Sequence, residues 1–111
     1  MSDHRRHPRF DLRRRVWCEG DHYTVWLQTV NASELGLQLR TSIPPPPGTR
    51  LRLSLEDAGG GRVVAEAEVV WARAGRGRGA MGLRILSFAE GQELWREIVR
   101  ATLQTERAAD E

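Results

Sequence analysis

The 111-residue sequence predicts a mainly β domain: a small six-stranded antiparallel β-barrel with a C-terminal α-helix packed on it. Three observations lead to this prediction. Apolar residues recur at every second position from about residue 16 to residue 86, which is typical of strands with one buried face. Turns rich in glycine or proline divide this region into segments of hairpin length. Beyond residue 88 the apolar period becomes that of a helix.

The first three strands follow from the alternation of apolar and polar side chains. Val16 and Cys18 indicate a short strand that stops at a Gly-Asp pair. The second strand covers residues 23–29 and leads into Asn31. The third covers residues 35–40, where leucine alternates with glycine, glutamine and arginine.

The last three strands are separated by stronger turn signals. The proline run at 44–47 predicts a rigid turn before a strand at 50–55, in which leucine again takes every second position. The glycine triplet at 59–61 predicts a hairpin loop before a longer strand at 63–71. A second glycine-rich turn then precedes the sixth strand at 81–85.

The helix is predicted from apolar residues spaced three and four apart. Ser87 and Glu90 have the spacing of a capping box, so we expect the helix to begin near Phe88. We expect it to end near Gln104. Its apolar face consists of Leu94, Trp95, Ile98, Val99 and Thr102.

Length and charge predict one domain with a basic N-terminal arm. We expect residues 1–14 to form a flexible basic arm, residues 15–105 the barrel with its helix, and residues 106–111 a frayed tail. Residues 1–15 hold six arginines against two acidic residues, whereas the remaining chain holds eleven arginines against thirteen acidic residues. Such an arm attracts an anion, such as a nucleotide, nucleic acid, acidic lipid or acidic protein.

The sequence offers little support for catalysis, a metal site or membrane insertion. Cys18 is the single cysteine, and the three histidines have no metal-ligand spacing, so we expect neither a metal nor a cofactor. A reduced thiol and the lack of a signal peptide favour a cytoplasmic protein. No apolar run approaches the ~20 residues that cross a bilayer. No catalytic pair or triad stands out, so we do not expect an enzyme.

The first informative motif lies in the basic arm. Arg5 and Arg9 form an R-x-x-x-R pattern, with Arg6 inside it, and Pro8 disfavours helical geometry for the residue before it. Four extended residues span at most ~14 Å, about the width of two nucleotides. Each guanidinium can pair bidentately with a phosphate or with the O6/N7 edge of guanine. A merely solvated basic arm is the alternative interpretation.

The second motif lies at the end of the second strand. Asn31, Ser33 and Gly36 form an N-x-S-x-x-G pattern. Because residues i and i+2 of a strand point to the same face, the amide and the hydroxyl should project together. Gly36 can adopt a positive φ or let a ligand approach the backbone closely. Ordinary turn chemistry at these three positions is the alternative.

The two motifs, in this order on a strand-rich chain, resemble the signature of PilZ domains, the family of bacterial cyclic di-GMP receptors. The resemblance covers about residues 5–103 and includes the segments 69–71 and 82–85. It implies cyclic di-GMP as the ligand and a downstream protein as the partner, with links to motility and biofilm regulation. It also implies that the arm closes over the ligand on the barrel.

The resemblance implies a role for each motif residue. Arg5 and Arg9 would grip guanine and phosphate groups, and Arg6 could add a phosphate contact. This chain has His4 where many members carry a further arginine, which leaves open whether one ligand or an intercalated pair binds.

On the barrel, Asn31 and Ser33 would bond a guanine edge or a phosphate, and Gly36 would leave room for the base. Trp71 would line the ligand or stack on it, although core packing explains this residue equally well.

Two other functions remain as alternatives. A ligand-free adaptor of the same fold would act through protein contacts alone. A nucleic-acid binder would use the basic arm, and its binding would weaken steeply with salt; we do not expect nucleic acid as the partner. We expect a monomer or a weak dimer.

Overall fold

The computed structural model describes the backbone of residues 10–11 and 14–110 and the side chains of residues 14–101. Most of the basic arm, including Arg5, Arg6 and Arg9, therefore lies outside the described residues. The described elements, in chain order, are β1 (Phe10–Asp11), β2 (Arg15–Gly20), β3 (Tyr23–Ser33), β4 (Gly36–Arg40), β5 (Arg50–Glu56), β6 (Arg62–Arg73), β7 (Ala80–Glu90) and α1 (Gln92–Asp110).

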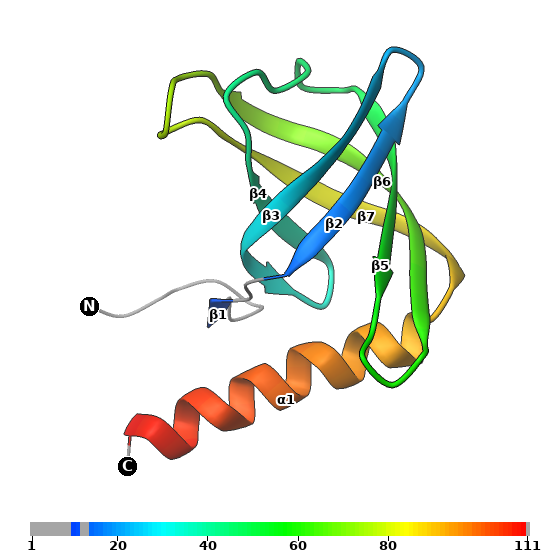
Figure 1. Ribbon diagram of the computed structural model, residues 1–111, viewed down its shortest axis with the longest axis vertical. Coiled ribbons are helices and arrows are strands. Elements are labelled where there is room, and N and C mark those ends of the chain that lie inside the picture. The colour runs from blue at the N-terminus through cyan, green and yellow to red at the C-terminus, as the bar shows by residue number, and fades with distance from the viewer. Residues whose placement is uncertain (1–9, 12–13, 111) are drawn as a thin grey trace.

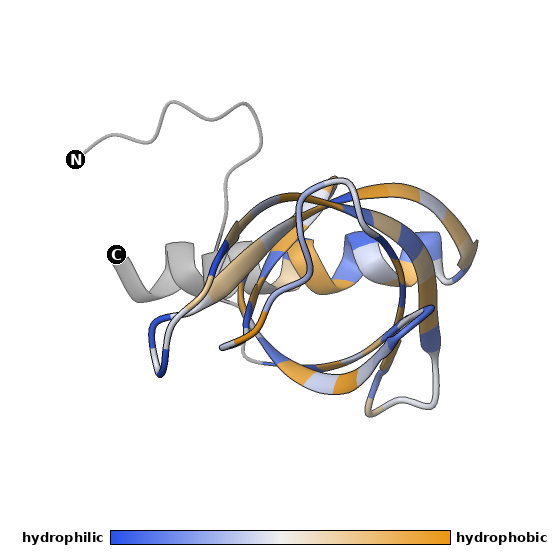
Figure 2. Cartoon of the chain, turned by 90° about the horizontal axis from the view of Figure 1, so that it is seen from above, coloured by the Kyte–Doolittle hydropathy of each residue, from blue (hydrophilic) through white to orange (hydrophobic). Residues whose placement is uncertain are grey.

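Six of the strands close into a barrel. The strands neighbour one another in the order β3, β2, β5, β6, β7 and β4, and β4 pairs back onto β3. All of these pairings are antiparallel. Figure 1 shows α1 lying across one end of the barrel, and Figure 2 shows the ring of strands from above. The predicted six-stranded antiparallel barrel with a C-terminal helix is confirmed.

Alternating side chains of each strand build the core inside the ring. In β5, Leu51, Leu53 and Leu55 are buried, whereas Arg50 and Arg52 are exposed. Because successive side chains of a strand point to opposite faces, the three leucines share the inner face. Burial of each such side chain stabilises the fold by about 1.5–3 kcal/mol.

The helix closes one end of this core. Trp95, Ile98 and Val99 are buried in the same cluster as residues of the barrel interior, such as Val16 and Leu37. The residues between them on α1 are exposed, as the amphipathic pattern predicted.

The helix begins later than the sequence predicted. Ser87 and Phe88 belong to β7, which pairs with β6 as far as Glu90, so the expected capping box does not form. Gly91, with a φ of 80°, ends the strand, and its carbonyl accepts the bond from the Trp95 amide at 2.9 Å. A Cβ at this position would overlap the Arg62 carbonyl oxygen, so only glycine fits here without distortion.

The strands and the helix are also longer than predicted. The last two strands exceed the expected segments 63–71 and 81–85, because β6 and β7 remain paired beyond them. At the C-terminus, α1 continues to Asp110 instead of ending near Gln104.

The β1 strand was not predicted. It lies outside the ring and pairs with the last residues of β3, opposite Asn31 and Ala32. Two residues carry no visible period in the sequence, so this pairing could not be found there.

Candidate ligand-binding site

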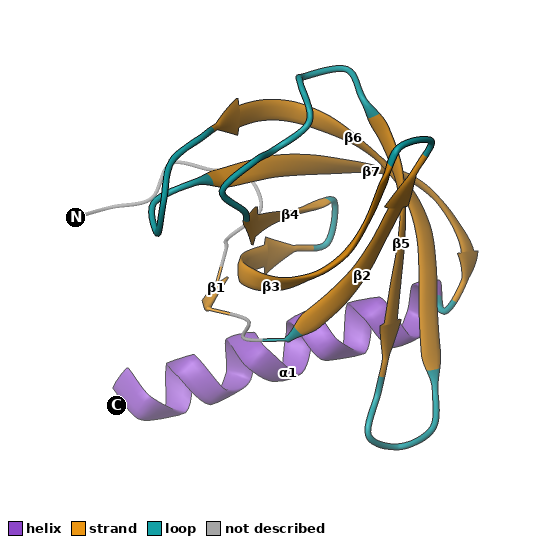
Figure 3. Cartoon of the chain, turned by 45° about the horizontal axis from the view of Figure 1, so that its top comes forward, coloured by secondary structure: helices purple, strands orange, loops and turns teal. Residues whose placement is uncertain are grey.

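The root of the N-terminal arm is fastened to the second motif. Phe10 pairs with Ala32, and Asp11 pairs with Asn31. The chain that follows Arg9 by one peptide bond therefore runs antiparallel to the N-x-S stretch of β3 (Figure 3). Phe10, the residue directly after the first motif in the sequence, thus lies beside the strand that carries the second motif.

Arg14 provides a second anchor for the arm. Its amide donates to Thr29 Oγ1 at 2.8 Å, and its carbonyl accepts from the Thr29 amide at 2.8 Å. Its guanidinium forms an ion pair with Asp57 at 3.3 Å. Because Thr29 is buried, these bonds are sheltered from water and hold the end of the arm against β3.

A β-bulge in β3 decides where Asn31 points. The register with β4 shifts between Thr29 and Asn31, so that Val30 is an extra residue. Thr29 and Ala32 are both buried, whereas strict alternation would have placed Thr29 and Asn31 on the same inner face. The bulge instead turns Asn31 to the outer wall. There its amide nitrogen donates to Gln38 Oε1 at 3.0 Å.

The β3–β4 hairpin holds the other two motif residues. Ser33 pairs with Gly36 around a two-residue turn, and the Ser33 hydroxyl donates to the Gly36 carbonyl at 3.5 Å. Ser33 is 4% exposed. Its carbonyl and that of Glu34 both accept from Trp95 Nε1 at 3.2 Å, so α1 fixes the hairpin from below. Gly36 is buried and has no positive φ, so the turn itself does not require glycine at this position.

Trp71 lies flat against the barrel wall. It pairs with Gly82 of β7, and a Cβ on Gly82 would overlap the indole nitrogen. A register shift between Val69 and Trp71 places this ring outside the core, whereas Val69 is buried. Arg73 lies over the indole, with its Cζ 5.8 Å from the ring centroid. Core packing of Trp71, the alternative interpretation from the sequence, is wrong.

The strand registers place these residues in one row. Asn31 pairs with Gln38, Gln38 pairs with Gly82, and Gly82 pairs with Trp71. The row crosses β3, β4, β7 and β6, and neighbouring strands are about 4.8 Å apart, so it spans about 14 Å. Its two ends offer an amide and an indole ring, and the glycine between them gives the indole room to lie against β7.

Gln38 and Gly82 are site residues that the sequence analysis missed. A signal for Gln38 was present, because a two-residue turn between Ser33 and Gly36 puts Gln38 opposite Asn31. Gly82 could not be found, since its place beside Trp71 depends on a register shift between β6 and β7.

Burial makes the single thiol inert. Cys18 is fully buried, and burial raises its pKa to about 12, so the nucleophilic thiolate is scarce at neutral pH. The described residues contain no group of three or more His, Cys, Asp or Glu side chains that could hold a metal ion. Among these residues, no helix is long and apolar enough to cross a membrane.

Comparison with known proteins identifies the family. The sequence matches the PilZ domain over residues 3–104. The chain belongs to the PilZ domain family. This match includes both motifs and the whole barrel. No curated protein sequence matches the chain.

Solved PilZ structures have the same fold. The PilZ domain of YcgR from Escherichia coli, determined with c-di-GMP, has a TM-score of 0.60 at 17% identity, over 96% of this chain and 95% of that one. The PilZ domain of CeSA from a cellulose-synthesizing bacterium has a TM-score of 0.62 at 17% identity, over 89% and 98%.

A third structure is that of a larger protein. The Bacillus subtilis inhibitor of motility, MotI/DgrA, has a TM-score of 0.73 at 20% identity. The match covers 93% of this PilZ chain but only 53% of MotI, so this chain spans about half the length of that protein.

Proposed function

We propose that this protein is a cyclic di-GMP receptor that passes the level of the second messenger to a protein partner. The observation that carries the proposal is the pairing of β1 with Asn31 and Ala32. This pairing joins the chain directly after Arg9 to the second motif. An arginine pair and a polar barrel face can then act on the same ligand.

The proposed ligand contacts combine both motifs. Arg5 and Arg9 pair with phosphate or guanine edges, and Arg6 adds a phosphate contact. Asn31 bonds a guanine edge from the outer wall. At the other end of the row a base stacks on Trp71 and takes the place that Arg73 occupies over the indole. The row length of about 14 Å suits a dinucleotide.

Ser33 and Gly36 would assist at the hairpin. Ser33 is 4% exposed, and its hydroxyl donates to the Gly36 carbonyl. This bond fixes the turn beside Asn31. The hydroxyl oxygen can still accept a hydrogen bond. Gly36 leaves the backbone free of a side chain where the base approaches.

The proposed output is a change of surface when the arm closes on the ligand. Ordering of a segment by phosphate contacts is a known switching device. The protein then acts as a binding module without catalysis, and its partner recognises the ordered surface. The relatives include a PilZ domain solved with c-di-GMP and an inhibitor of motility, which agrees with this role.

Calorimetric titration tests the proposal. The purified protein is titrated with cyclic di-GMP, with GTP, cyclic di-AMP and a short DNA duplex as controls. Saturable binding of cyclic di-GMP alone is the expected result, and the molar ratio distinguishes one ligand from an intercalated pair. Absence of binding would favour the ligand-free adaptor, and salt-sensitive binding of the duplex would favour a nucleic-acid binder.

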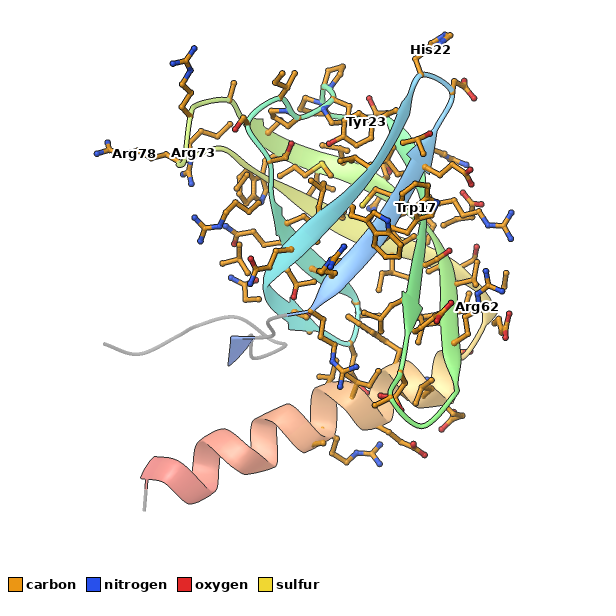
Figure 4. All side chains as sticks on the ribbon, viewed as in Figure 1. Trp17, His22, Tyr23, Arg62, Arg73 and Arg78 are labelled. Atoms are coloured by element: carbon orange, nitrogen blue, oxygen red, sulfur yellow. The ribbon has the colours of Figure 1, made fainter. Side chains whose placement is uncertain are left out.

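The Arg9→Ala variant locates the site. We expect it to lose about 1–3 kcal/mol of binding free energy, the scale of one bidentate arginine contact. Arg62→Ala is the matched control, because Arg62 is an exposed arginine at the end of β6 remote from Trp71 and Arg73 (Figure 4). Unchanged affinity in Arg9→Ala would remove Arg9 from the site.

A further inference from the structure

The β6–β7 hairpin and the end of β4 enclose a groove that adjoins the proposed ligand site at Gln38 and Arg73 and extends away from it. Its volume is about 730 Å³. We call it the basic groove. It is lined by Val30, Gln38, Arg40, Arg73, Ala74, Gly75, Arg76, Arg78, Gly79 and Ala80.

The charge of the basic groove has one sign. Four arginines line it and no acidic residue does. In the part of the chain that the structure describes, none of these four forms an ion pair. Arg40 donates to the Gly77 carbonyl at 3.5 Å and Arg73 to the Arg78 carbonyl at 3.2 Å, which leaves most of their N–H donors available.

A second groove of similar size shows that this charge is distinctive. That groove, of about 740 Å³, lies between the β2–β3 hairpin and the proline turn. It is lined by Glu19, Asp21 and Glu66 as well as by Arg50 and Arg52. Its mixed charges do not select an anion, whereas the basic groove attracts one.

The backbone holds the basic groove in shape. The Thr41 amide donates to the Gly79 carbonyl at 3.1 Å, and the Gly75 amide donates to the Ser42 carbonyl at 3.2 Å. A Cβ on Gly79 would overlap the Thr41 carbonyl oxygen, so the hairpin and the loop after β4 are in close contact. A preformed groove needs less ordering when it binds a partner.

An apolar side chain lies beside these charges. Ile43 is 81% exposed and follows Ser42, the residue bonded to the hairpin. Figure 4 shows Arg73 and Arg78 together at this hairpin, on the side of the barrel away from Arg62. The surface thus offers guanidinium groups and one exposed aliphatic contact.

We propose that the basic groove docks an acidic segment of a protein partner, with its carboxylates paired to the arginines and an apolar side chain against Ile43. Guanidinium forks match carboxylates bidentately. A flat bilayer fits a concave surface poorly, and the lining has no aromatic residue on which the bases of a nucleic acid could stack.

This proposal goes beyond ligand binding and does not depend on it. The basic groove adjoins the row of residues from Asn31 to Trp71, because Gln38 lines the groove and also accepts the hydrogen bond from the Asn31 side-chain amide. The affinity for the partner segment can be measured first without cyclic di-GMP and then in its presence.

The test begins with a random dodecapeptide library displayed on phage and selected on the full-length protein. The enriched peptide is synthesised with a fluorescent label, and its affinity is measured by anisotropy. The test variant is Arg76→Glu/Arg78→Glu. The matched control is Arg62→Glu/Arg100→Glu, which changes the net charge equally at two exposed arginines outside the groove. Circular dichroism checks that both variants fold.

We expect enriched peptides rich in aspartate and glutamate. Their affinity should fall at least tenfold in the test variant and less than twofold in the control. Enrichment without acidic residues, or an equal loss in both variants, would overturn the proposal. The proposal would also be overturned if a dT oligonucleotide or phosphatidylserine vesicles bound more tightly than the peptide and this binding were lost in the test variant. The occupant of the groove would then carry phosphate.

Discussion

At the scale of single residues, the outer wall depends on contacts that a side chain of another size would disrupt. Gly82 allows the Trp71 ring to lie against β7, because a Cβ there would overlap the indole nitrogen. Arg73 covers the same ring. The orientation of the proposed stacking residue is thus set by a neighbour that need not touch the ligand.

This contact leads to a testable prediction. Trp71→Ala should weaken cyclic di-GMP binding by about 1–3 kcal/mol, the range for base–aromatic stacking. Gly82→Ala should give a similar loss, because the indole must move away from the wall. Calorimetry on both single variants and on the double variant tests the coupling. A Gly82→Ala protein with wild-type affinity, or losses that add in the double variant, would contradict the prediction.

Cys18 allows a prediction about stability and pH. Burial raises its pKa from 9.0 to about 12, so the folded protein keeps the thiol neutral while the unfolded chain ionises it. The unfolded state binds fewer protons above pH 9, and the free energy of unfolding should therefore fall as the pH rises from about 9 towards 12. The slope from this group is at most about 1.4 kcal/mol per pH unit.

Urea unfolding at pH 8, 9.5 and 10.5 measures this effect. The Cys18→Ala variant is the control, since it lacks the thiol and keeps every other titrating group. The stability difference between the two proteins should shrink with rising pH, and a difference that stays constant would show that Cys18 titrates normally.

At the scale of the elements, α1 supports the hairpin that carries the second motif. Trp95 Nε1 donates to the carbonyls of Ser33 and Glu34, and its ring is buried in the core. The helix therefore does more than close the barrel, because it holds the β3–β4 turn next to Asn31.

The Trp95→Phe variant tests this support. It keeps an aromatic ring but leaves two carbonyls without their donor, so we expect a loss of about 1–3 kcal/mol in the free energy of unfolding. Denaturant unfolding measures the loss. Glu97→Gln, at an exposed position of the same helix, should change stability by less than about 0.5 kcal/mol. If both variants were equally stable, the hydrogen bonds from Trp95 Nε1 would not contribute to the free energy of unfolding.

The elements also show which parts of the secondary structure could be predicted from the sequence. The alternation of Leu51, Leu53 and Leu55 was enough to predict β5 and its buried face, because burial of one face imposes a period of two. The helix start was wrong because Ser87 and Glu90 favour a cap locally, while pairing with β6 continues to Glu90. Local propensity was outweighed by a pairing with residues more than twenty positions away.

At the scale of the whole molecule, the folding core and the arginine motif are separate. The buried cluster contains residues from Val16 to Val99, whereas Arg5 and Arg9 precede every residue of it. The barrel should therefore fold without the arm, and the arm should matter for the ligand.

Removal of residues 1–9 tests this separation. We expect the melting temperature of the truncated protein to stay within a few degrees of that of the full chain. We expect cyclic di-GMP binding to be lost, because the arginines proposed to bind its phosphates are gone. Circular dichroism and calorimetry give the two readouts. Retained binding would move the site away from the arm, and an unfolded product would show that the arm belongs to the core.

The sequence by itself determined the barrel, the terminal helix and the two motifs, because one-sided burial and turn chemistry leave local patterns in the chain. Only the tertiary structure decided how the residues of the candidate site are arranged. The bulge at Val30 turns Asn31 outward, β1 joins the arm to β3, and the strand registers bring Gln38, Gly82 and Trp71 into one row. These features depend on pairing between segments far apart in the sequence, and no local period records which residue lies opposite which.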